Sequence, residues 1–441
     1  MKDRLSLLVE QAQAAERHDR LDDAIRLYRE VLRLRPHWPA AEMNLGLVYF
    51  SQKNYVGAIE QLSDALRHNP ALDSAYLFRG AAYSIGGERE KAIRDLNRYL
   101  LHDRASMEAL AYLAGAYYDA NDFAHAALQY AEQIRIAPSE NLWFQLGDCY
   151  LQMARFSMTR LSEDPQAKYY FLLLSAEELL PGDKRELAEE QVREAIRLDP
   201  QAPEAAAVLR RIAGETKQDC KEPRDPQLVR ANCLAQSGDF AAATQALVVQ
   251  PSPKATYWSF RIAKRLAQSA MEKLAPDSPL LALLRAQIFE QNGQDEEADK
   301  QYRMAMLGVE SLIRYGKFQC KRSQFNEGLD LYNRALALEP GNPRILALIG
   351  EVYATEGQPE KALSYLRDAL ATAPRDIKSR IYLAQCLGRM DRAAEAIAQL
   401  EAAPEDPDGR IHYVLGTLYQ QGGNSEKARR AMDIFRQRKK R

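Results

Sequence analysis

Apolar residues recur along this chain at spacings of three, four and seven positions, which is the period of an amphipathic helix. One clear example, within residues 39–70, reads Glu42-x-x-Leu45-Gly46-x-x-Tyr49, then Ala58-x-x-x-Leu62, then Pro70. The two helical stretches are separated by a turn signal at Asn54 and end at a proline, which stops a helix without removing a needed hydrogen bond. The pattern predicts a hairpin of two packed helices.

The same hairpin pattern returns in register elsewhere in the chain. Gly46 and Gly80 are 34 positions apart, and so are Ala58 and Ala92. Further copies read Tyr76-x-x-Arg79-Gly80-x-x-Tyr83, Leu110-x-x-Leu113-Ala114-x-x-Tyr117, Leu346-x-x-Ile349-Gly350-x-x-Tyr353 and His412-x-x-Leu415-Gly416-x-x-Tyr419. A small residue in each helix lets the two helices of a hairpin approach closely. Repeated copies of one helical hairpin predict an all-α solenoid.

These copies resemble the tetratricopeptide repeat family, whose 34-residue unit is a helix-turn-helix, and the chain is similar to its bacterial multi-repeat members. The resemblance implies a right-handed α-solenoid of hairpins whose first helices line a concave groove. It also implies a non-catalytic scaffold that binds segments of protein partners in that groove. We therefore expect a protein or peptide partner and no small-molecule substrate.

A polar, proline-containing segment at 214–226 divides the predicted repeats into two arrays, 1–213 and 227–441. In the first array we expect a long helix at 141–163 and hairpins near 5–38, 39–72, 73–106, 107–139 and 169–202. In the second we expect a long helix at 255–275 and hairpins near 227–250, 279–308, 309–342, 343–376, 377–408 and 409–441. The long helices carry Trp143 and Trp258. They represent either drift of the repeat or packing anchors where the superhelix bends or docks on itself.

The resemblance also assigns groove positions on the first helices. In the first array these positions hold an apolar, partly aromatic stripe: Met43, Leu47, Phe50, Leu77, Ala81, Ile85, Ala111, Tyr118 and Phe144. Soluble proteins rarely leave so large an apolar patch bare. We expect it to be filled either by an apolar segment of a partner or by the long helix at 141–163 and its neighbour.

In the second array the same positions are predominantly basic, and they hold Lys317, Lys321, Arg344, Lys378 and Arg389 beside Glu310 and Glu351. Such a face suits an acidic peptide or a C-terminal carboxylate, because charge-assisted hydrogen bonds are stronger than neutral ones. Ordinary solvated surface charge is the alternative interpretation.

Composition and motifs narrow the function classes. The 60 basic and 61 acidic residues nearly cancel, which makes nucleic acid an unlikely partner. Motifs for nucleotide phosphates, dinucleotides, metalloproteases and serine hydrolases are absent from the sequence. The six histidines are scattered along the chain, so we expect no catalytic residues, no metal site and no cofactor.

The five cysteines include no C-x-x-C pair. Cys220 lies in the polar segment and Cys233 just beyond it, where they are either free thiols or, in an oxidising compartment, a disulfide. Asp3 and Glu10 interrupt the region that would be apolar in a signal peptide, and no apolar run is long enough to span a bilayer. We expect a cytoplasmic chain, although a periplasmic or secreted chain that had lost its signal would look the same.

Two other functions remain open at this stage. The array is alternatively a structural or assembly subunit of a multiprotein complex, with self-association, or a regulatory arm of a multi-chain enzyme. Behaviour on size exclusion and the presence of a co-purifying catalytic partner would separate these from a scaffold.

Overall fold

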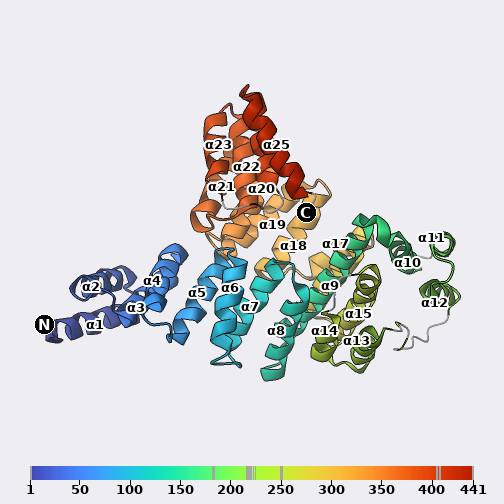
Figure 1. The fold of residues 1–441 in the computed structure, drawn as a ribbon, viewed down its shortest axis with the longest axis horizontal. Helices are drawn as coiled ribbons and strands as arrows, with labels where there is room; N and C mark the ends of the chain where they lie inside the picture. Colours follow the sequence, from blue (N-terminus) through green and yellow to red (C-terminus); the bar gives the residue numbers. More distant parts are fainter. Residues whose placement is uncertain are drawn as a thin grey trace. The chain divides into compact units, whose positions relative to one another are not determined.

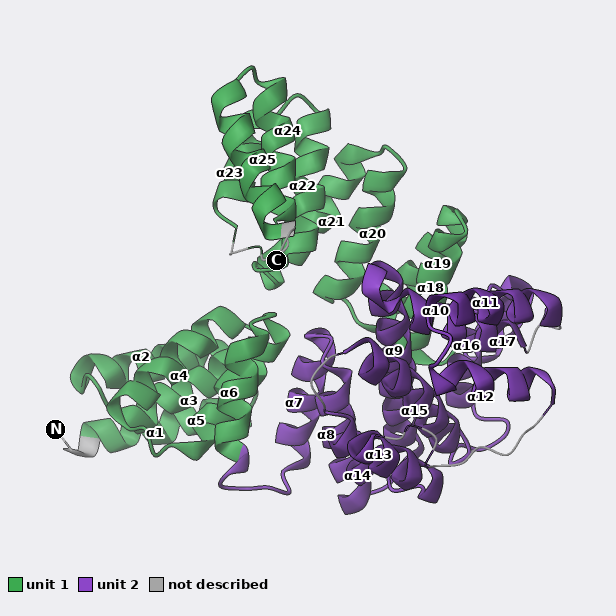
Figure 2. Cartoon of the chain, turned by 45° about the vertical axis from the view of Figure 1, so that its right-hand side comes forward, with its two compact units in different colours: residues 1–99, 306–441 green, residues 100–305 purple. Residues whose placement is uncertain are grey.

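The computed structural model describes residues 2–180, 184–214, 221, 223, 225–248, 252–403, 406 and 409–439. Across these ranges the chain forms 25 α-helices and one short 3-10 helix, without a strand (Figure 1). The prediction of an all-α solenoid is therefore confirmed. The helices fall into two compact units, residues 1–99 with 306–441 and residues 100–305 (Figure 2).

The first unit consists of helical hairpins. Its amino-terminal helices are α1 (Lys2–Arg17), α2 (Leu21–Leu34), α3 (Pro39–Ser51), α4 (Tyr55–His68), α5 (Asp73–Ile85) and α6 (Arg89–Leu100). Its carboxy-terminal helices are α18 (Gly308–Lys321), α19 (Phe325–Leu338), α20 (Pro343–Thr355), α21 (Pro359–Thr372), α22 (Ile377–Arg389), α23 (Ala393–Glu401), α24 (Arg410–Gln421) and α25 (Ser425–Lys439). Within the hairpins the first and second helices pack directly against each other.

Small residues set the spacing of these hairpins. A Cβ added to Gly46 in α3 would lie only 2.7 Å from Cγ of Leu62 in α4. The same distance separates a Cβ on Gly350 in α20 from Cγ of Leu366 in α21. Contacts this short are tighter than van der Waals packing allows, so only glycine fits. The close approach inferred from the repeat pattern is thus present in the structure.

Local capping explains where many helices begin. The Asn54 side chain accepts a hydrogen bond from the Gly57 amide at 3.0 Å, which satisfies one free donor at the start of α4. Asp122 does the same for the His125 amide at the start of α8, at 3.2 Å. Proline occupies the first turn of α3 and α20, where its missing amide hydrogen costs nothing.

The second unit departs from simple repetition. It contains α7 (Met107–Asp119), α8 (Phe123–Ile136), α9 (Glu140–Glu163), η1 (Pro165–Ala167), α10 (Lys168–Leu179), α11 (Arg185–Leu198), α12 (Pro203–Ile212), α13 (Pro226–Ser237), α14 (Phe240–Leu247), α15 (Pro253–Met271), α16 (Pro279–Gln291) and α17 (Asp295–Met304). Its two long helices are α9 and α15, and α9 packs extensively along α15. Helix α12 was not predicted.

The pairing of α9 with α15 explains the two tryptophans. A Cβ on Gly147 in α9 would lie 3.1 Å from Leu284 of α16 and 3.6 Å from Ala270 of α15. Because Gly147 has no side chain, α9 can pack closely against these helices, which follow the 214–226 segment in the chain. Trp258 of α15 is 1% exposed. Trp143 of α9 packs edge-on against Phe240, with ring centroids 5.3 Å apart. The structure favours the interpretation in which the chain docks on itself.

The compact units cut across the two arrays inferred from the sequence. Helices α9 and α15 come from opposite sides of the 214–226 segment, yet both belong to the unit formed by residues 100–305. The hydroxyls of Tyr150 in α9 and Thr244 in α14 add a buried hydrogen bond of 2.7 Å across the same boundary. Burial raises the pKa of Tyr150 well above its usual range, so this hydroxyl stays protonated.

Candidate functional site

Charged side chains link the first helices of the carboxy-terminal repeats along one face. Arg344 of α20 donates a hydrogen bond to Glu310 of α18 at 2.7 Å. Lys378 of α22 donates to Glu351 of α20 at 2.6 Å, and the Tyr382 hydroxyl donates to the other Glu351 oxygen at 2.9 Å. Since each contact joins one first helix to the next, α18, α20 and α22 present a continuous charged surface. We call this surface, together with Lys317 and Lys321, the basic face.

Lys317 of α18 is the least compensated cation of the basic face. It is exposed and makes no ion pair with any residue that the structure describes. Desolvation, and then the neighbouring cations Arg344, Lys378 and Arg314 against the opposing effect of Glu310, lower the pKa of Lys317 to about 8. The Lys317 side chain is exposed, yet the surrounding protein still removes part of the water that would stabilise its charged form. An ammonium held among cations favours an incoming anion.

The acidic residues of the basic face are already engaged. Arg314 donates to Glu310 at 2.7 Å, so this carboxylate bridges two guanidinium groups. Desolvation alone would raise the pKa of Glu310, but Arg314 and Arg344 together lower it, which keeps the carboxylate ionised. Arg389 donates to the Ala354 carbonyl at 2.7 Å and satisfies an acceptor in the last turn of α20. Lys321 lies exposed in the last turn of α18.

The predicted apolar stripe is only partly available at the surface of the first unit. Met43, Leu47 and Phe50 of α3 are half-buried, and the Phe50 ring packs edge-on against Phe78 and Tyr55. The predicted side chains on α5 differ in exposure, and Ala81 among them is fully buried. Leu77 is 5% exposed and belongs to the core, whereas Ile85 is 38% exposed.

In the second unit the chain itself covers the predicted groove positions. The Tyr118 hydroxyl of α7 donates to the buried Asp148 carboxylate of α9 at 2.7 Å. Phe144 of α9 is 2% exposed because α8, α10, α15 and α16 surround this helix. Ala111 of α7 remains exposed. Both Tyr118 and Phe144 are thus committed to internal packing, which agrees with the alternative that the long helix fills this part of the stripe.

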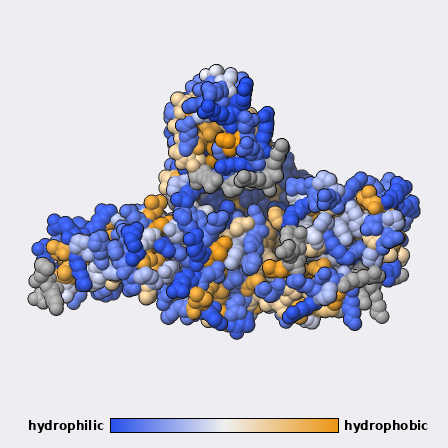
Figure 3. Space-filling view, in the orientation of Figure 1, coloured by the Kyte–Doolittle hydropathy of each residue, from blue (hydrophilic) through white to orange (hydrophobic). Residues whose placement is uncertain are grey.

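The face drawn in Figure 3 is mostly hydrophilic, with apolar atoms in small scattered groups. No helix among the described ranges is both long and apolar enough to cross a membrane. Cys149, Cys320 and Cys386 are free thiols, and Cys233 is disulfide-bonded. Cys220 lies outside the described residues, so its pairing with Cys233 stays a prediction.

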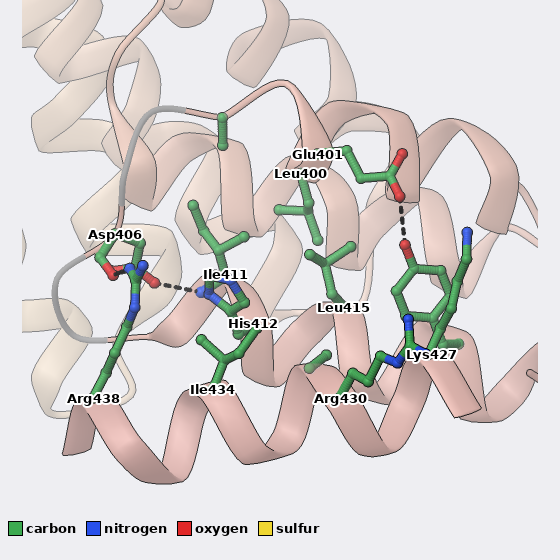
Figure 4. A pocket seen from close by; sticks show the side chains of 13 residues that line it. Leu400, Glu401, Asp406, Ile411, His412, Leu415, Lys427, Arg430, Ile434 and Arg438 are labelled. Carbon is green, nitrogen blue, oxygen red and sulfur yellow. Dashed lines mark hydrogen bonds between the residues drawn. The ribbon is translucent and has the colours of Figure 1, made fainter. Parts of the chain in front are cut away.

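A pocket of about 400 Å³ lies under the last hairpin, between α23, α24 and α25 (Figure 4). Its floor is apolar, and the cations at its rim are Lys427, Arg430 and Arg438. Asp406 accepts a hydrogen bond from the Ile411 amide at 2.6 Å and so fixes the start of α24. Desolvation, and then Arg438, lower the pKa of His412, which keeps this imidazole neutral at physiological pH. In the sequence, His412 stands at the first position of the last repeat copy.

The structure also brings together three residues that the sequence does not associate. Ligand atoms of His37, Glu42 and His68 all lie within 4.8 Å of one another. The scattered histidines of the sequence predicted no metal site. The one sequence signal for this cluster was that His37 and His68 are separated by nearly one repeat length. Equivalent positions of neighbouring repeats lie close together in a solenoid.

Comparisons with known proteins agree with the helical hairpins. A tetratricopeptide repeat family model matches residues 9–76, and a model for subunit 3 of the anaphase-promoting complex, or cyclosome, matches residues 321–403. No curated protein matches the sequence.

Several solved structures are similar in fold. A crystal structure of MamA is 18% identical with a TM-score of 0.34, and the match covers 50% of this chain and 99% of MamA. The hetero-tetramer Cut9–Hcn1 of the anaphase-promoting complex is 13% identical with a TM-score of 0.35, covering 99% and 96%. PilF of Pseudomonas aeruginosa is 17% identical with a TM-score of 0.32, covering 48% and 90%.

The stacked helical hairpins place this chain among the α-solenoid repeat proteins. Within that class the chain carries tetratricopeptide-type repeats, since residues 9–76 match the model of this repeat and Gly46 and Gly350 make the same close contact in two of its hairpins. Proteins with this repeat typically serve as protein-interaction scaffolds and are typically non-catalytic.

Proposed function

We propose that this protein is a non-catalytic scaffold and that its basic face binds an acidic segment of a partner protein. The observation that carries the proposal is Lys317. Its ammonium lies among Arg314, Arg344 and Lys378 without an ion pair to the described residues, and its pKa is lowered to about 8. A carboxylate placed there would relieve the repulsion between these cations and would form charge-assisted hydrogen bonds.

The shape of the basic face supports an extended ligand. Contacts between α18 and α20 and between α20 and α22 hold the charged groups in fixed positions. A preformed helical surface loses little conformational entropy on binding, so the cost of ordering falls on the ligand alone. Acidic side chains spaced along a peptide, or an acidic C-terminus, match this arrangement of cations.

Fluorescence anisotropy with a labelled glutamate-rich peptide tests the proposal. We expect Lys317→Ala to weaken binding of this peptide by about tenfold, which is typical of losing one well-placed charged hydrogen bond. The matched control is Lys361→Ala, which removes an exposed lysine from the second helix α21 of the same repeats. Equal losses in both variants would reduce the effect to general charge attraction and would contradict the proposal.

The apolar stripe of the first unit supports a second binding surface. Ile85 and the half-buried side chains of α3 can accept an apolar segment of a partner. Capture of partners with wild-type protein and with Ile85→Glu, after circular dichroism has shown both to be folded, tests this surface. Loss of a partner from the variant alone would support it, whereas identical partners would leave α3 and α5 as internal packing.

The other functional interpretations make different predictions. An assembly subunit with self-association should elute as an oligomer, and a regulatory arm should co-purify with a catalytic chain. Neither requires an uncompensated lysine on the first helices, so unchanged peptide binding in Lys317→Ala would favour them.

A further inference from the structure

Three side chains with metal-binding chemistry converge at the junction of the first two hairpins. His37 lies in the loop before α3, Glu42 in the first turn of α3, and His68 at the last position of α4. Their ligand atoms all lie within 4.8 Å of one another. His68 Nδ1 is 2.8 Å from a Glu42 oxygen, and the His37 and His68 ring centroids are 4.6 Å apart.

The identity of residue 42 is unexpected for its place in the repeat. The equivalent position of other copies carries a bulky packing residue, namely Tyr76, Leu110, Leu346 or His412. Here a carboxylate occupies it, and the Glu42 side chain is 7% exposed. A buried carboxylate is unfavourable unless it is paired or coordinates a metal. The Glu42 carboxylate therefore needs polar partners, and the His68 imidazole already lies 2.8 Å from one of its oxygens.

The backbone at His37 has a left-handed conformation, with a φ angle of 59°. Histidine, asparagine and aspartate are enriched in this region among non-glycine residues. The corresponding loop between α19 and α20 reads Pro340-Gly341 where this one reads Pro36-His37, and Gly341 has a φ of 75°. Glycine at position 37 would therefore keep this backbone conformation while it removes the imidazole.

We infer that His37, Glu42 and His68 bind one divalent transition-metal ion of the zinc type. Two imidazoles and one carboxylate are a common donor set for Zn²⁺, with bonds of about 2.0–2.2 Å. Ligand atoms around such a tetrahedral ion are roughly 3.3 Å apart, so small side-chain rotations close the present cluster around it. Three protein donors leave one coordination position for water or for a group from another molecule.

The ion would add a further link between elements that packing and side-chain hydrogen bonds already hold together. The loop between α2 and α3 carries His37, and the end of α4 carries His68, so one ion connects the first hairpin to the end of the second. The donors would be one unprotonated nitrogen of each imidazole and the Glu42 carboxylate. A bound ion stabilises the folded array because the unfolded chain lacks the assembled site.

Metal titration of the full chain tests the inference. The untagged protein, stripped with a chelator, is titrated with Co²⁺ while visible absorption is followed, and Zn²⁺ is then added to displace it. We expect one equivalent of Co²⁺ to bind, with displacement by Zn²⁺. We also expect His37→Gly to weaken Co²⁺ binding by at least about tenfold, and glycine suits the backbone there, so the fold is preserved.

The remaining variants separate the site from general histidine binding. Glu42→Gln and His68→Gln should each lose the Co²⁺ band, whereas His18→Gln, which changes an exposed histidine of the same repeats, should keep it. Zn²⁺ should raise the melting temperature of wild type but not of His37→Gly. Equal Co²⁺ affinity of wild type and His37→Gly, or the absence of a stoichiometric Co²⁺ signal in wild type, would overturn the inference.

Discussion

Gly46 and Leu62 show how single residues determine the distance between the helices of one hairpin. A methyl group on Gly46 would lie 2.7 Å from Cγ and 2.9 Å from Cδ2 of Leu62, and 3.3 Å from its backbone nitrogen. The side chain can rotate, but the backbone of α4 cannot yield without moving the helix. Substitution here therefore changes the packing of the whole hairpin.

We expect Gly46→Ala to destabilise the protein by about 1–3 kcal/mol, the usual cost of overpacking a core. Gly115 in α7 provides the control, because a Cβ added there meets nothing within 4 Å. Gly115→Ala should stabilise its helix by up to about 1 kcal/mol through helix propensity alone. Thermal melting followed by far-UV circular dichroism checks both, and equal effects would contradict the close approach.

The lowered pKa of Lys317 predicts that binding of an acidic peptide depends on pH. Because its pKa is lowered to about 8, the ammonium loses its proton on raising pH from 7 to 9, well below the usual range for lysine. Affinity for an acidic peptide should be present below pH 8 and should fall as pH rises through 8. Lys317→Arg keeps its charge throughout and should bind without this fall.

Anisotropy titrations at several pH values measure the effect. A fall of the same size in wild type and Lys317→Arg would show that another group titrates. Removing a neighbouring cation in Arg344→Gln should raise the Lys317 pKa and shift the fall to higher pH.

At the scale of elements, the packing of α9 along α15 holds the second unit together. Trp258 of α15 is fully buried, and it also lies under the Arg261 guanidinium, 4.6 Å from the ring centroid. We expect Trp258→Ala to cost about 3–5 kcal/mol, as for other buried aromatic truncations. Phe156→Ala, on the exposed side of α9, should cost less than about 1 kcal/mol. Chemical denaturation would contradict this account if both substitutions cost the same.

The helices themselves were largely predictable from sequence, since the 34-residue register and the prolines act locally. Both long helices were also predicted from the sequence. The sequence of α9 has no turn signal after Gly147, and the sequence of α15 has none before its end. Their pairing was not predictable. Contacts between α9 and α15 depend on side chains far apart in the chain, and no single-sequence periodicity encodes which helix meets which.

The candidate sites also differ in how far the sequence alone predicts them. The basic face could be inferred because its residues recur at fixed positions of each repeat. The cluster of His37, Glu42 and His68 could not, because it depends on a loop conformation and on the end of another helix. Burial of Phe144 and Leu77 also depends on tertiary neighbours rather than on their repeat positions.

For the whole molecule, the compact unit of residues 100–305 predicts how fragments behave. A fragment 100–305 keeps α9 and α15 together and should be a helical monomer with cooperative melting. A fragment 1–213 contains α9 without α15, exposes its packed face and should aggregate or melt without cooperativity. Adding a fragment 227–441 should rescue it as a one-to-one complex.

Size exclusion with circular dichroism compares these fragments. A monomeric fragment 1–213 that melts as cooperatively as the intact chain would contradict the role of the α9–α15 packing. It would instead support two independently folded arrays joined by the 214–226 segment.

The central claim, that the first helices of the carboxy-terminal repeats receive a partner protein, is tested most directly by site-specific photo-crosslinking in native lysate. Benzoylphenylalanine replaces Lys321 on the basic face in one variant and Arg334 on the second helix α19 in another. We predict a distinct crosslinked protein from position 321 alone, which an excess of the glutamate-rich peptide displaces. The same crosslinked species from both positions, or crosslinking from position 334 alone, would contradict the claim.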